Sequence, residues 1–73
     1  MMTTQLARQL ASNAIGGCAV TGAISAQGLA SAVNDQAASW GWSVPAVVPA
    51  AVAERAADRR YDALASWILE HAC

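Results

Sequence analysis

Residues 25–41, with the sequence SAQGLASAVNDQAASWG, decide the fold because they predict one amphipathic helix with a clear start and a clear end. Ser25 is a typical N-cap residue, and Gly41 suits the left-handed conformation that follows the last turn of a helix. The apolar residues at helical spacing between these two positions are Leu29, Val33, Ala37 and Trp40. The stretch therefore predicts a helix over residues 25–40 with one face packed against the rest of the chain.

The segment before this helix predicts a first helix over residues 4–14. Thr3 or Thr4 can cap its start, and Leu6, Leu10 and Ala14 form a stripe at a spacing of four residues. The pair Gly16-Gly17 predicts that the helix ends there.

The segment after it contains Pro45 and Pro49. A proline inside a helix removes a hydrogen bond, so we expect this segment to begin with a connector. A helical pattern then extends over residues 50–71. The expected apolar face of this last helix consists of Ala53, Ala57, Tyr61 or Arg60, Leu64 and Ile68.

The composition predicts an all-α fold in a single domain of residues 1–73, built as a small Ala-rich bundle of three or four short helices. The chain has 19 alanines among 73 residues, only 14 Val, Ile and Leu residues together, and no Phe. Alanine favours helices and their close approach, but it buries little apolar area. A core of this kind gives a small domain only a few kcal/mol, so we expect the chain to self-associate.

The charges exclude several function classes. Four basic and five acidic side chains give a net charge of -1, which argues against nucleic acid as a partner. The uncharged stretch over residues 14–33 carries four glycines and few large aliphatic side chains, so a membrane partner is not expected.

No catalytic, metal or cofactor site is expected either. The single histidine, His71, is two residues from Cys73, and such a pair points to different faces of a helix. One histidine with one or two thiols also lacks the ligand spacing of a zinc site.

The aromatic residues Trp40 and Trp42 flank Gly41 and are the first candidates for partner contacts. We expect Trp40 and Trp67 to anchor the core of the bundle. Trp42 follows the glycine and lies off the helical stripe, so we expect it to be an exposed anchor at an interface.

The last helix carries the other candidate contact residues, Arg55, Arg59 and Tyr61. Arg55, Arg59 and Arg60 lie on adjoining turns of this helix, and arginines so placed can bind an acidic partner or a phosphate. The alternative is that they are ordinary solvated side chains paired with Asp58 and Asp62.

These features favour a small non-enzymatic, cytoplasmic protein-binding module that acts as an adaptor, inhibitor or accessory subunit through helix–helix contacts. The expected partner is another protein, and the expected state is a homodimer. Cys18 and Cys73 fit this hypothesis as reduced thiols, although they also permit one disulfide.

Two alternatives come from other function classes. Leu6, Leu10, Ile15 and Gly16-Gly17, followed by Cys18, are similar to the double-glycine leader of secreted peptide bacteriocins. That resemblance implies a precursor of a secreted antimicrobial or signalling peptide, cleaved after Gly17. The second of these alternatives is a small membrane-active protein.

Overall fold

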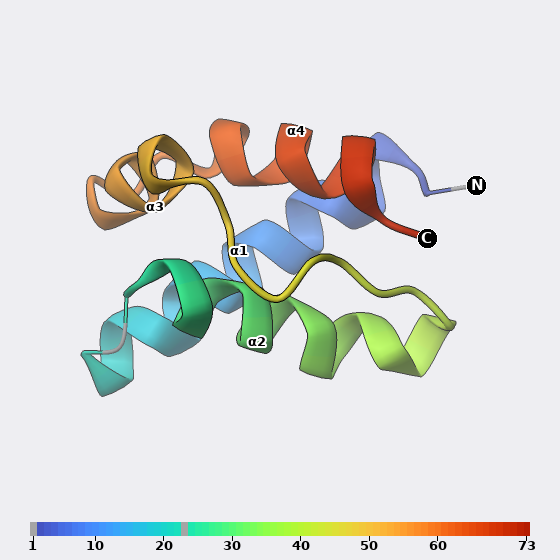
Figure 1. The fold of residues 1–73 in the computed structure, drawn as a ribbon, viewed down its shortest axis with the longest axis horizontal. Coiled ribbons are helices and arrows are strands. Elements are labelled where there is room, and N and C mark those ends of the chain that lie inside the picture. The colour runs from blue at the N-terminus through green and yellow to red at the C-terminus, as the bar shows by residue number, and fades with distance from the viewer. Residues whose placement is uncertain (1, 23) are drawn as a thin grey trace.

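The chain folds into a small helical bundle, which confirms the all-α prediction (Figure 1). The computed structural model describes residues 2–22 and 24–73. In these two ranges the regular elements are α1 (Thr4–Thr21), α2 (Ala26–Ala37), the 3₁₀ turn η1 (Ala38–Trp40), α3 (Ala50–Ala57) and α4 (Tyr61–His71). Among the same residues, no helix has the length and apolar character needed to cross a bilayer.

Helix α1 continues through Gly16-Gly17, so the predicted end of the first helix near residue 14 is wrong. The helix ends at Gly22, which has a φ of 73° and donates its backbone N–H to the carbonyl of Cys18. Both inner glycines face solvent, and a Cβ added at either would meet nothing within 4 Å. They therefore cost the helix only intrinsic propensity, which the burial of Ile15 and Cys18 on its other face offsets.

Helix α1 is the element against which α2, α3 and α4 all pack. In Figure 1 it lies behind and between α4 and α2. Seven of the eighteen buried apolar residues in the described part of the chain are alanines, which lets the helices approach closely. The largest fully buried side chains are Leu10, Ile15, Leu29, Val33, Val48, Leu64 and Ile68.

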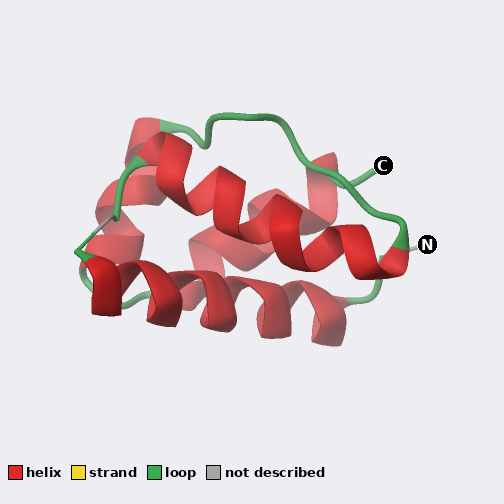
Figure 2. Ribbon diagram, turned by 90° about the horizontal axis from the view of Figure 1, so that it is seen from below, coloured by secondary structure: helices red, strands yellow, loops and turns green. Residues whose placement is uncertain are grey.

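The connector, residues 41–49, closes the side of the bundle away from α1 (Figure 2). Its Val44 is held by the Asn34 side chain, which accepts the Val44 backbone N–H at 2.7 Å and donates to the Val44 carbonyl at 3.0 Å. Val48 donates its backbone N–H to the Ala26 carbonyl at 3.1 Å, which gives a second attachment to α2. Val44 and Val48 are buried, so the connector contributes to the core.

The predicted helix over residues 50–71 is two helices, α3 and α4, joined by a tight turn at residues 58–60. An unbroken helix of that length would extend about 33 Å, whereas the longest dimension of the molecule is 30 Å. The break lets α3 fold back against α4. The break also changes which residues are buried: Ala56 is buried, whereas Ala57 and Tyr61, which were expected on the apolar face, are exposed.

The continuity of α1 predicts that Gly17→Ala stabilises the protein. The new methyl group enters open space, and alanine is the better residue in a helix interior, so the free energy of unfolding should rise by about 0.5–1 kcal/mol. Urea denaturation measures this difference. Gly22→Ala is the control and should destabilise the protein, because its φ of 73° disfavours any residue with a Cβ. A destabilised Gly17→Ala variant would mean that α1 does not continue through this position.

The attachment of the connector predicts a loss of stability in Asn34→Ala. The variant leaves the partly buried N–H and carbonyl of Val44 without their partner, which should lower the free energy of unfolding by about 1–3 kcal/mol. Ser31→Ala is the matched control, since Ser31 is an exposed polar residue of the same helix and should change stability by less than about 0.5 kcal/mol. Equal stability of the two variants in urea would contradict the role of Asn34.

Candidate functional site

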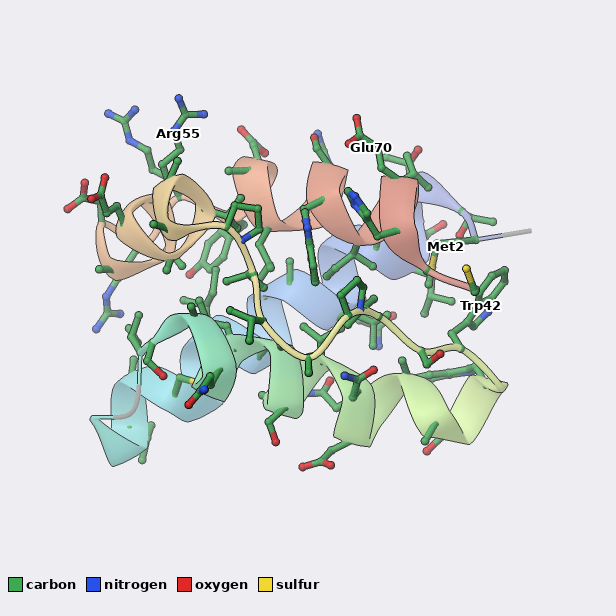
Figure 3. All side chains as sticks on the ribbon, in the orientation of Figure 1. Met2, Trp42, Arg55 and Glu70 are labelled. Carbon is green, nitrogen blue, oxygen red and sulfur yellow. The ribbon has the colours of Figure 1, made fainter. Side chains whose placement is uncertain are left out.

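The five predicted contact residues lie at opposite ends of the molecule and do not form one site. Trp40 and Trp42 lie where η1 leads into the connector, whereas Arg55, Arg59 and Tyr61 lie around the turn between α3 and α4. Figure 3 shows Trp42 beside Met2 at one end of the molecule and Arg55 at the other end, extending away from the body.

Of the three tryptophans, only Trp67 is placed in the core as expected, with 6% of its surface exposed. The prediction that Trp40 anchors the core is wrong, because 52% of its surface is exposed. Residues 38–40, at the end of the predicted stripe, form a 3₁₀ turn rather than α-helix. Because this turn has three residues per turn, Trp40 no longer lies on the buried face of α2. Trp42 is half-buried against the core rather than fully exposed, and its backbone N–H donates to the Ala37 carbonyl at 3.0 Å.

Trp42 lines an open depression of about 710 Å³, which we call the Trp42 pocket. Its lining residues come from the start of the chain, the connector and the end of α4: Met2, Thr3, Thr4, Trp42, Leu69 and Ala72. None of these side chains is charged. Leu69 leaves 40% of its surface exposed, while Met2 is buried, so the pocket has an apolar floor and an accessible apolar wall.

Backbone pairing holds the walls of the Trp42 pocket together. Ser43 and Cys73 exchange two backbone hydrogen bonds, each of 3.0 Å, which fix the connector beside the end of α4. Thr3 caps α1 by accepting the N–H of Leu6 at 3.1 Å, which orients the start of the chain. The pocket is thus built from three segments that are distant in sequence.

Three arginines line a second depression of about 420 Å³ at the other end, which we call the arginine pocket. Its lining residues are Arg55, Arg59, Arg60, Tyr61, Asp62 and Ala63. The structure therefore brings together three of the predicted contact residues, Arg55, Arg59 and Tyr61, with Arg60, the third arginine that the sequence offered for an acidic partner or a phosphate. All three arginines are exposed, and Tyr61 exposes 40% of its surface.

The two cysteines are thiols in this structure, and they differ in access. Cys18 is buried, and burial raises the pKa of its thiol because the thiolate would lose hydration. Cys73 is exposed, and its thiol lies 3.6 Å from the carbonyl oxygen of His71. The end of α1 that carries Cys18 lies at the side of the molecule opposite the C-terminus (Figure 1).

The His71 ring is engaged with α4 rather than with Cys73. Its Nδ1 lies 3.0 Å from the carbonyl oxygen of Trp67, and the two rings stack with centroids 5.4 Å apart. Across residues 2–22 and 24–73, no three His, Cys, Asp or Glu side chains are grouped so that they could hold a metal ion.

Sequence reasoning missed Met2, Leu69 and Ala72 as lining residues of the Trp42 pocket. Leu69 could have been identified from the sequence, because it is a large apolar residue one position away from the stripe that contains Leu64 and Ile68. Nothing in the sequence indicated that Met2 lies close to Trp42, because this proximity depends on the packing of α1 against α4.

Comparison with protein-family models, with curated proteins and with solved structures found no match to this chain.

Proposed function

We propose that the chain is a small protein-binding module whose Trp42 pocket receives apolar side chains of a partner protein. The observation that carries the proposal is the pocket itself: six uncharged residues around an open depression, in a chain whose other large aliphatic side chains are mostly buried. Such a surface releases water when an apolar group covers it, and it offers no charge to an ionic ligand.

A protein partner fits this pocket better than a small ligand because the depression is open to solvent. Small-molecule sites enclose most of the ligand surface, whereas protein interfaces use aromatic and apolar anchors within a wider contact. Trp40, exposed only two residues from Trp42, would extend that contact onto η1. An adaptor, an inhibitor or an accessory subunit would use such a surface, and a cytoplasmic location remains part of the proposal.

Self-association is the second part of the proposal. A stable homodimer buries about 800 Å² on each subunit, close to a fifth of the 4256 Å² that this chain exposes. Light scattering coupled to size exclusion distinguishes a monomer from this dimer.

The precursor alternative receives less support from the packing. Cleavage after Gly17 would cut inside α1 and remove buried core residues, namely Met2, Ala7, Leu10, Ala11, Ala14 and Ile15. The remainder would lose the helix against which the other three pack. An intact mass lacking residues 1–17 in the source cells would nevertheless favour that alternative.

The proposal predicts that a photoreactive benzoylphenylalanine at position 69 crosslinks the full chain to a discrete protein in the cells that produce it. Leu69 forms the accessible wall of the pocket, so a bound partner lies within reach. Val47 is the matched control position, since it is apolar and half exposed but does not line the pocket. The readout is the mass of the adduct and the identity of the attached protein.

Binding of the identified partner should then weaken at least about tenfold in Leu69→Asp, which places a charge in an uncharged pocket. Folding should be retained because Leu69 is partly exposed. An adduct that forms equally from positions 69 and 47, or unchanged affinity of Leu69→Asp, would contradict the proposal. An adduct with the mass of two copies would assign the pocket to the dimer interface instead.

A further inference from the structure

The pocket at the turn between α3 and α4 is lined by an excess of arginines, although residues 54–62 as a whole hold three arginines and three carboxylates and carry no net charge. Three of the four basic side chains, Arg55, Arg59 and Arg60, line the arginine pocket, and Asp62 is the only carboxylate among its lining residues. These four groups give a net charge of +2, whereas the whole chain carries -1. The other carboxylates of this region, Glu54 and Asp58, do not line the pocket.

Arg59 occupies a backbone position that favours glycine. Its φ is 62°, and it is the one residue other than glycine with a positive φ among those described. The Arg59 N–H donates to the Ala56 carbonyl at 2.9 Å and the Arg60 N–H to the Arg55 carbonyl at 2.9 Å, the hydrogen-bond pattern in which a helix ends at a left-handed residue. A Cβ in this conformation costs stability, so the turn is less stable with Arg59 than it would be with a glycine at this position.

The surroundings of the three arginines suit negatively charged oxygen atoms. Arg60 precedes α4, and its side chain does not cap the helix, so the first N–H groups of α4 add a positive potential at the rim. Guanidinium groups bind carboxylates with paired hydrogen bonds. Tyr61 adds an exposed aromatic face beside them, against which a peptide chain can pack.

We propose that the arginine pocket binds an acidic segment, rich in Glu or Asp, of a protein partner; this inference rests on the proposed protein-binding function and assigns it a second contact. Separated carboxylates can each pair with one arginine and avoid Asp62. A compact multiply charged phosphate would concentrate its charge close to the Asp62 carboxylate, which repels it. The pocket is also partly open to solvent, so an extended chain can reach it.

Fluorescence anisotropy with the full chain and a fluorescein-labelled Glu-Gly-Ser repeat peptide tests the inference at low ionic strength. We expect saturable binding that weakens with added salt and is absent for the matching Lys-Gly-Ser peptide. Arg59→Gly is the decisive variant: it should raise the thermal unfolding midpoint, because glycine relieves the left-handed position, and weaken binding at least about fivefold. A gain in stability excludes misfolding as the cause of lost binding.

Arg8→Gln is the charge-matched control, since Arg8 lies on α1 and does not line the arginine pocket. It should change the affinity by less than about twofold. Unchanged affinity in Arg59→Gly, equal binding of the Glu and Lys peptides, or complete competition by equimolar inorganic phosphate would overturn the inference. If a partner is crosslinked from position 69 but the acidic peptide does not bind, this inference alone is refuted. If the peptide binds but no partner is crosslinked, the proposed function of the Trp42 pocket is refuted.

Discussion

The packing of three helices against α1 is the constraint on which the rest of this structure depends. Helices α2, α3 and α4 each contact α1, and the alanines on its buried face, Ala7, Ala11 and Ala14, let them approach. A core with so many alanines gains little from each side chain, so it needs one long helix to offer contacts along its whole length. The extension of α1 through Gly16-Gly17 to Gly22 supplies that length.

The connector compensates for the gap that this arrangement leaves between α2 and α4. Val44 and Val48 fill the core from the side opposite α1, while Asn34 satisfies the Val44 backbone that enters with them. The paired backbones of Ser43 and Cys73 then bring the end of the chain beside Trp42. The same bonds that close the core therefore also build the Trp42 pocket.

The sequence predicted those features that depend on neighbouring residues. The caps at Thr3, one of two candidates, and at Ser25, the left-handed Gly41, and the helical character of most of residues 25–40 and 50–71 all follow from short-range chemistry. Features that depend on tertiary packing were not predictable. Gly16-Gly17 resembles a stop signal because glycine is a poor helix former, but burial on the other face of α1 outweighs that cost.

The break at residues 58–60 was missed for the opposite reason. No glycine or proline marks it, and Arg59 takes the left-handed position that glycine normally fills. Of the candidate contact residues, Arg55, Arg59 and Tyr61 line one pocket because they are close in sequence. The exposure of Trp40 and the lining of the Trp42 pocket by Met2 and Leu69 depend on the end of η1 and on the α1–α4 contact, which no local pattern reports.

The bundle thus presents a different pocket at each of its two ends, one lined by uncharged residues that include Trp42, the other lined by three arginines. Both depend on α1 as a continuous support, since α4 contributes to each pocket and packs against α1. Amide hydrogen exchange along α1, measured by NMR on the full chain, tests this support most directly. If α1 is a continuous support, the amides of residues 17–20 are protected to a similar degree as those of residues 10–14. Exchange at unprotected rates beyond residue 14 would contradict it.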